Sequence, residues 1–172
     1  MTGHTPYRRS DRTKAQASVF LEILKLAEDL QRGFTELFKQ YDLSNAQFNV
    51  LRVLRGAGDE GLTCGDIASR LVQHDPDITR LLDRLEKREL IVRHRSTVDR
   101  RVVRTRITQA GLDILAKLDV PVDELHEEQF GHLSEVVLQD ALALINTLRG
   151  PAAQVVGAAV AERACSEEPV NG

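Results

Sequence analysis

Thr79, Arg80 and Arg84 are the residues of this chain whose types and spacing suit contact with duplex DNA. A threonine hydroxyl can bond a base edge, and an arginine can reach guanine O6 and N7 in a bidentate pair. Arg84 follows Arg80 by one helical turn, which suits a backbone phosphate. All three lie opposite a predicted apolar face made of Ile78, Leu81, Leu82 and Leu85. The pattern predicts a helix that presents these side chains to a major groove.

A second, shorter helix is predicted just before this one, as a helix-turn-helix requires. Thr63 is a good N-cap, and Asp66 three residues later suits the positive end of the helix dipole. The apolar residues that follow at helical spacing are Ile67, Ala68 and Leu71. We expect the base-reading helix to restart at Asp75 and Pro76, because a proline has no N–H to lose in a first turn.

Alternating residues after Leu90 predict two short strands, at 91–95 and 103–107, joined by a polar connection. A two-stranded ribbon with arginines at its tip is typical of a wing, and such arginines fit a minor groove or the flanking phosphates. We expect Asp99 and Arg101 to form an ion pair that fixes the tip. Arg100 is then the freer of the two arginines to contact DNA.

Charge is unevenly distributed, although the net charge of −3 would by itself argue against a nucleic-acid partner. Residues 70–106 contain eleven Lys or Arg and six Asp or Glu, whereas the rest of the chain contains twelve and twenty. A basic face on an otherwise acidic body is what a DNA-binding protein shows.

These residues resemble the MarR family of bacterial winged-helix transcription regulators, over roughly positions 20–150. The most specific motifs are ITRLLDRLEKR at 78–88, DRR at 99–101 and ITQAG at 107–111. The resemblance implies that Thr79 and Arg80 read bases and that Arg84 assists at the backbone. It also implies that Arg101 pairs with Asp99 and touches DNA.

The sequence departs from the family pattern at two positions. Glu89 stands where the family usually has a glycine that ends the recognition helix, and Ile107 replaces a leucine. In the family a small aromatic or phenolic anion often binds between the helical and wing domains. An aromatic lining here would have to come from residues that helical spacing assigns to the core: Phe20, Phe34, Phe38, Tyr41 and Phe48.

Long apolar stripes flank the winged unit. The stripe at 13–41 exceeds what a small domain can cover, so it requires another helix, and we expect a second chain to supply it. Pro121 should kink or restart the helix that follows Gly111. We predict a mainly α fold with a small antiparallel β wing, divided into a disordered basic arm (1–12), a helical dimerisation domain (13–43 and 109–150), a winged helix-turn-helix DNA-binding domain (44–108) and a C-terminal tail (151–172).

Composition places the chain among soluble globular proteins, with 42% hydrophobic and 28% charged residues. There is no run of eighteen apolar residues and no signal-peptide pattern at the N-terminus, so we expect a cytoplasmic protein with no membrane partner. We therefore expect a homodimeric regulator, a repressor, that binds a pseudo-palindromic site with half-sites ~10 bp apart.

Other functions fit the sequence less well. Hydrolase and phosphate-loop motifs are missing, so we expect no enzyme and no cofactor. A metal-responsive regulator remains an alternative on account of His126 and His132, whose spacing of six differs from the usual ligand spacing. A redox-responsive regulator would depend on Cys64 or Cys165. A winged helix used for protein contacts is the third alternative.

Overall fold

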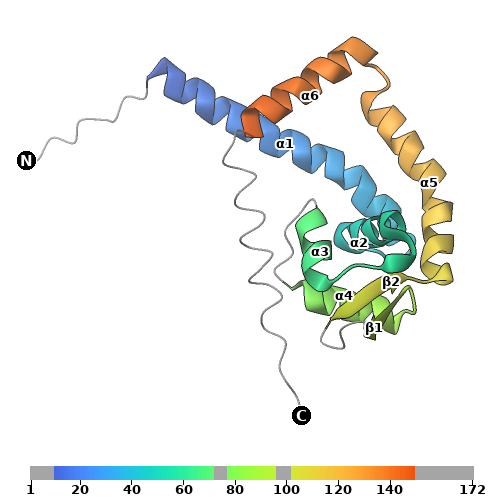
Figure 1. Ribbon diagram of the computed structural model, residues 1–172. Helices are drawn as coiled ribbons and strands as arrows, with labels where there is room; N and C mark the ends of the chain where they lie inside the picture. Colours follow the sequence, from blue (N-terminus) through green and yellow to red (C-terminus); the bar gives the residue numbers. More distant parts are fainter. Residues whose placement is uncertain (1–9, 72–76, 96–101, 150–172) are drawn as a thin grey trace, which may run out of the picture.

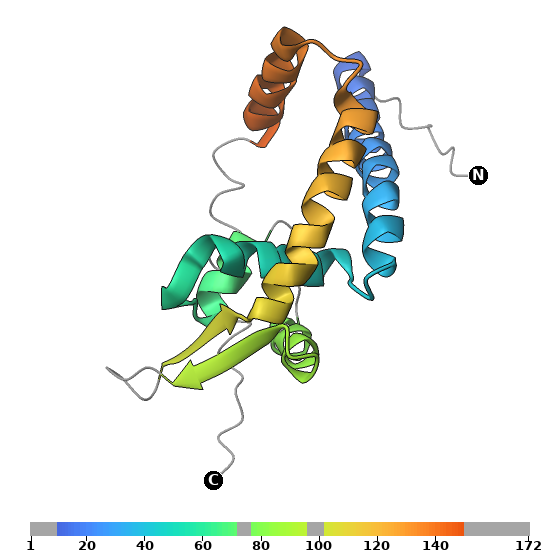
Figure 2. The same ribbon diagram turned by 90° about the vertical axis from the view of Figure 1, so that its right-hand side faces the viewer.

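The computed structural model describes residues 10–71, 77–95 and 102–149. A compact unit of short helices and one small sheet carries an arm of long helices (Figures 1 and 2). This confirms the predicted class, mainly helical with a small antiparallel wing. In order, the elements are α1 (Asp11–Lys39), α2 (Asn45–Ala57), the 3-10 helix η1 (Gly58–Glu60), α3 (Cys64–Arg70), α4 (Ile78–Lys87), β1 (Ile91–Arg95), β2 (Val103–Ile107), α5 (Gln109–Phe130) and α6 (Glu135–Arg149).

The core of the compact unit is formed where α2, α3, α4 and α5 meet. The four apolar residues predicted to face inward from α4 are all buried. They lie in one cluster with buried side chains of the other three helices, among them Leu51, Leu54, Ile67, Leu115 and Leu118. Burial of this stripe fixes which face of α4 points outward, because a helix turns its opposite face to solvent.

The wing is a two-stranded antiparallel sheet in which Ile91 pairs with Ile107 and Arg95 with Val103. A short segment before α3 extends it, because Leu62 and Thr105 exchange both backbone hydrogen bonds (3.0 and 2.7 Å). Gly61 makes this approach possible. Its φ is +66°, and a Cβ there would lie 2.7 Å from the Thr105 carbonyl oxygen.

A reciprocal capping box starts α3. The Thr63 hydroxyl accepts from the Asp66 N–H (3.2 Å), and the Asp66 carboxylate accepts from the Thr63 N–H (3.2 Å). The Thr63 hydroxyl also donates to that carboxylate (2.8 Å). The hydrogen bond from the Thr63 side chain is the main reason why the pKa of Asp66 lies below its ordinary value of 3.8. The sequence predicted the cap, and the acidic residue turns out to belong to the same motif.

The end of α4 explains the unusual Glu89. Its φ is +59°, the left-handed conformation in which a glycine would normally stand. The Glu89 N–H donates to the Glu86 carbonyl (2.8 Å), and the Leu90 N–H donates to the Leu85 carbonyl (3.1 Å). Leu85 and Leu90 are both buried, which completes a Schellman motif with its hydrophobic contact. The turn therefore forms without glycine, at the cost of left-handed strain.

Three helix boundaries differ from the sequence-based expectation. Ser10 caps α1, so the helix begins at Asp11, inside the stretch expected to form a disordered arm. α4 begins at Ile78 with Asp77 as its cap, whereas the restart expected at Asp75 and Pro76 lies outside the described residues. α5 continues through Pro121 as one helix. The buried neighbours Leu118 and Val122 hold that turn in place, so packing overrides the local preference of proline.

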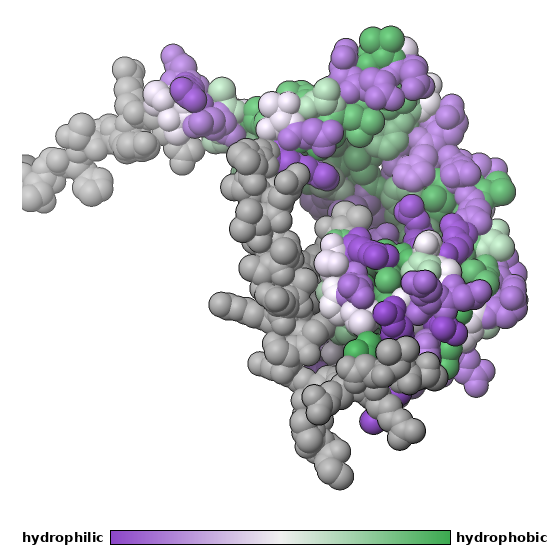
Figure 3. Space-filling view, in the orientation of Figure 1, coloured by the Kyte–Doolittle hydropathy of each residue, from purple (hydrophilic) through white to green (hydrophobic). Residues whose placement is uncertain are grey.

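The long helices leave many apolar side chains uncovered. α6, which is described in full, has no buried residue. Figure 3 shows hydrophobic residues gathered in the upper part of the molecule, over α1 and α6. Phe20, which the sequence assigned to the core, is 61% exposed. Within the described ranges, no helix has the length and apolar character needed to cross a bilayer. The largest exposed groups on the two helices are Val19, Phe20, Leu21, Ile23, Leu24, Leu26, Val136, Val137, Leu142, Leu144, Ile145 and Leu148.

We expect Glu89→Gly to raise the free energy of unfolding by about 1 kcal/mol, because glycine adopts positive φ without the steric penalty of a Cβ. Urea denaturation measures the change. Glu89→Ala is the matched control, because alanine removes the charge but keeps the Cβ. Equal stabilisation by both substitutions would show that the charge, and not the backbone, is responsible.

We expect Thr63→Ala to lower the free energy of unfolding by roughly 1 kcal/mol near neutral pH, because it removes the cap of α3. The pKa of Asp66 is depressed in the folded state, so its contribution is present above 3.8 and is lost as the pH falls through the folded value. The difference in free energy of unfolding between Thr63→Ala and wild type should therefore become smaller at acidic pH. Thr63→Ser keeps the hydroxyl and should behave as wild type; a loss independent of pH would exclude the link to Asp66.

Candidate nucleic-acid interface

The three predicted DNA-contacting residues of α4 lie together on its exposed side. Thr79, Arg80 and Arg84 are all exposed, and the buried stripe of the helix lies behind them. Lys87 is exposed one turn further along. The helix therefore offers one hydroxyl and three cationic groups along a single accessible surface. This is the set of donors that phosphates and the major-groove edges of bases accept from.

The first turn of α4 holds Arg80 close to the helix N-terminus. The Asp77 carboxylate accepts from the Arg80 N–H (3.4 Å) and lies 3.2 Å from the Arg80 guanidinium. Both side chains remain largely exposed, at 76% for Arg80 and 48% for Asp77. An exposed ion pair of this kind contributes little stability and exchanges easily for another partner. Arg80 is thus oriented by its neighbour and still accessible.

The tip of the wing lies outside the described residues. This applies to Asp99, Arg100 and Arg101, so their ion pair and DNA contacts stay predictions. The strands that lead to the tip are described, and their arginines differ in their contacts within the protein. Arg104 donates to the Gly61 carbonyl (3.1 Å), whereas Arg95 is exposed.

Arg93 of β1 joins the wing to α4, a role that sequence reasoning missed. Its guanidinium donates to the Asp83 carboxylate (2.6 Å) and lies 3.6 Å from a Glu86 oxygen. The same guanidinium lies 3.4 Å from the Thr79 carbonyl, and the Arg93 backbone N–H donates to Glu86 (3.1 Å). The sequence feature that could have indicated this contact is the presence of two carboxylates, Asp83 and Glu86, on a helix otherwise suited to bind DNA.

Arg88 joins the other end of α4 to the turn that follows the long helix α1. Its guanidinium donates to the backbone carbonyls of Asp42 and, at 3.1 Å, of Tyr41. Asp42 has a φ of +55°, which turns the chain after α1. The position of α4 is therefore linked directly to the end of the arm.

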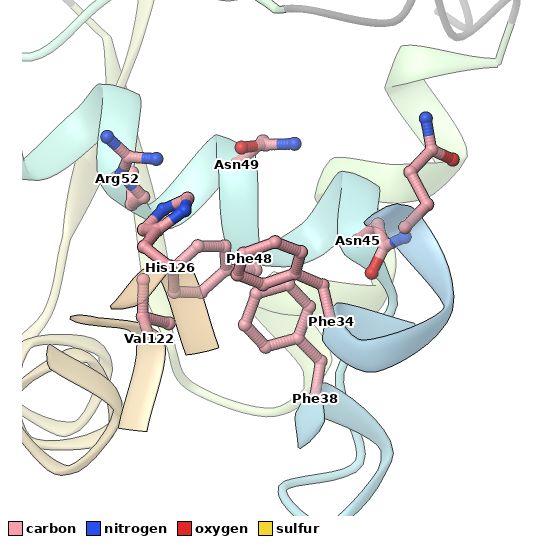
Figure 4. A pocket seen from close by; sticks show the side chains of 9 residues that line it. Phe34, Phe38, Asn45, Phe48, Asn49, Arg52, Val122 and His126 are labelled. Carbon is pink, nitrogen blue, oxygen red and sulfur yellow. The ribbon is translucent and has the colours of Figure 1, made fainter. Parts of the chain in front are cut away.

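A cavity of about 280 Å³ lies between α1, α2 and α5 (Figure 4). Phe38 and Phe48 stack at its floor with ring centroids 4.0 Å apart, and Phe34 lies 5.0 Å from the ring of His126. Arg52 lies over Phe48, 5.8 Å from its ring centre. Phe34, Phe38 and Phe48 thus belong to the core and also line a cavity, whereas the sequence assigned them to the core alone.

Candidate metal and thiol groups do not converge in the described part of the chain. No cluster of three or more His, Cys, Asp or Glu there could hold a metal ion. His126 instead lines the aromatic cavity. Cys64 is half-buried in the first turn of α3, and Cys165 lies outside the described residues.

Comparison with known proteins agrees with this geometry. The MarR family pattern matches residues 41–102. The HTH-type transcriptional regulator FarR of Neisseria gonorrhoeae is 29% identical over 130 residues, which cover 74% of this chain and 88% of FarR.

Two solved structures share the fold. A MarR transcription factor from Planctomyces limnophilus is 35% identical, with a TM-score of 0.59 and coverage of 82% of this chain and 98% of that one. A cysteine-to-serine mutant of MarR from E. coli, solved in complex with operator DNA, is 24% identical, with a TM-score of 0.70 and coverage of 81% and 99%. With the helix-turn-helix and wing described above, these similarities show that the chain belongs to the MarR family of transcriptional regulators.

Proposed function

We propose that this regulator binds a pseudo-palindromic operator as a homodimer and acts as a repressor. The observation that carries the proposal is the accessible surface of α4, where Thr79, Arg80 and Arg84 lie opposite the buried stripe. In this assignment Thr79 and Arg80 read base edges and Arg84 binds a phosphate. The structure of the E. coli relative with operator DNA supports the same use of the fold.

The wing completes the interface in this proposal. Arg100 binds phosphate or enters the adjacent minor groove, and Arg101 does so while paired with Asp99. β1 and β2 end at the paired residues Arg95 and Val103, next to the arginines assigned to the wing tip. Contacts from α4 and from the wing would then span neighbouring grooves.

A second copy of the chain is the partner we propose for the uncovered apolar faces of α1 and α6. α6 alone exposes Val137, Leu142, Ile145 and Leu148 to between 47% and 54% of their surface. Apolar surface on this scale marks a protein interface. Two-fold pairing through the long helices would hold two copies of α4 at the ~10 bp spacing of operator half-sites.

We further propose that the cavity beside α1 takes a small aromatic anion that regulates DNA binding. The phenylalanine rings supply an apolar, stacking surface, and the Arg52 guanidinium supplies positive charge at the same cavity. Occupancy would act on α1, whose end is bound to α4 through Arg88. A coupling free energy of about 1–3 kcal/mol is sufficient to change operator occupancy 5- to 150-fold.

We expect Arg80→Ala to weaken operator binding by roughly 1–3 kcal/mol and to relax base preference, because a bidentate base contact is lost. Arg100→Ala should weaken operator and scrambled DNA alike, because a phosphate contact carries no sequence information. Fluorescence anisotropy on DNA from upstream of the gene, with a scrambled duplex and a salt series, measures both. Equal losses on the two duplexes for Arg80→Ala would remove its base-reading role, and binding to neither duplex at low salt would refute the proposed function.

We expect Ile145→Glu to shift the protein from dimer to monomer, because a charge at a buried interface loses its hydration without gaining a partner. Sedimentation velocity measures the shift, and operator affinity should fall with it. Gln139→Glu is the matched control, because it adds the same charge on the polar side of α6. A wild-type protein that sediments as a monomer would contradict the proposed assembly.

A further inference from the structure

The recognition helix carries two carboxylates where a DNA-binding surface should have none. Asp83 lies between Arg80 and Arg84, and Glu86 follows one turn later. Free carboxylates at these positions would repel the phosphate backbone. Their side chains are 46% and 41% exposed, so burial in the core does not account for them.

Both carboxylates face β1, where the side chain of Arg93 forms ion pairs with them. Thr79, Asp83 and Glu86 have the i, i+4, i+7 spacing of a single helical stripe, and Arg93 contacts all three. The Arg93 side chain is only 23% exposed, less than either carboxylate. Its planar guanidinium can donate to the Asp83 carboxylate and the Thr79 carbonyl at the same time, which a lysine ammonium does less well.

The backbone of β1 takes part in the same contact. Arg93 pairs with Thr105 across the sheet, but both backbone groups of Thr105 are bound to Leu62. The Arg93 N–H therefore points to the outer edge of β1, and the Glu86 carboxylate accepts it (3.1 Å). The strand and the helix are thus joined by backbone and side chain at one position.

We propose that Arg93 is a positioning residue that sets the orientation of α4 relative to the wing and thereby the base specificity of the regulator. It acts through Asp83 and Glu86 and does not itself contact DNA. The role rests on the proposed function, because it concerns how Thr79 and Arg80 are aimed at base edges.

The test compares Arg93→Met, Asp83→Ala and the double variant on operator and scrambled duplexes across a salt series. Each single variant should lose on the order of tenfold in operator affinity, with little change on the scrambled duplex. The double variant should lose no more than the worse single variant, because both remove the same contact. Arg93→Lys should fall between wild type and Arg93→Met.

Asp83→Ala is the decisive variant, because charge alone predicts the opposite result. Removal of a negative charge from the DNA-facing helix would tighten binding to both duplexes if Asp83 acted only through repulsion. Tighter operator binding by this variant would overturn the proposal. The proposal would also be overturned if Arg93→Met lowered the slope of log K against log salt concentration by about one unit on scrambled DNA. Such a change is the signature of a lost phosphate contact.

A matched pair elsewhere controls for the loss of an inter-element ion pair. Arg55 of α2 donates to both carboxylate oxygens of Asp119 of α5 (2.9 Å each), away from α4 and the wing. Arg55→Met and Asp119→Ala should leave the ratio of operator to scrambled affinity unchanged. A similar loss of this ratio in the control variants would overturn the specific role of Arg93.

Hydrogen exchange of the DNA-free protein separates the positioning role from the proposed function. Amides of 78–87 and 91–95 should exchange several-fold faster in Arg93→Met and Asp83→Ala than in wild type, because the helix and strand are no longer joined. Unchanged exchange in both variants would overturn the positioning role. Wild-type protein that fails to distinguish operator from scrambled DNA would refute the proposed function, while the exchange result would still decide whether Arg93 holds α4.

Discussion

Burial of the apolar stripe of α4 is the constraint on which the rest of the structure depends. Ile78, Leu81, Leu82 and Leu85 are at most 5% exposed, and α4 packs against α2, α3 and β1. A helix held along one face cannot rotate, so the opposite face has a fixed composition and direction. The surface offered to DNA follows from this hydrophobic contact.

Polar contacts then set where α4 ends and how it is joined to the neighbouring elements. The Schellman turn at Glu89 ends α4, Arg93 joins its middle to β1, and Arg88 joins its end to the chain after α1. The turn is internal to the end of α4, whereas the two arginine contacts reach the wing and the turn after α1. α4 is therefore joined both to the wing and to the end of the arm.

Stability and function make different demands on the same helix. A left-handed Glu89 and two carboxylates on the recognition helix both conflict with local preferences. The first is tolerated because Leu85 and Leu90 are buried together behind the turn. The second is resolved by an arginine from another element. Conflicts of this kind indicate where tertiary contacts, and not local sequence, determine the conformation.

The sequence by itself determined the order of elements, the inward face of α4 and the exposed set of Thr79, Arg80 and Arg84, because hydrophobic periodicity and capping act over a few residues. It also identified the two-stranded wing from the alternation of its residues. Only the tertiary structure decided that Arg93 binds Asp83 and Glu86, that Arg88 reaches the end of α1, and that three core phenylalanines line a cavity. It likewise decided that α5 passes through Pro121 unbroken. These features depend on side chains brought together from distant parts of the chain, and no local periodicity records such contacts.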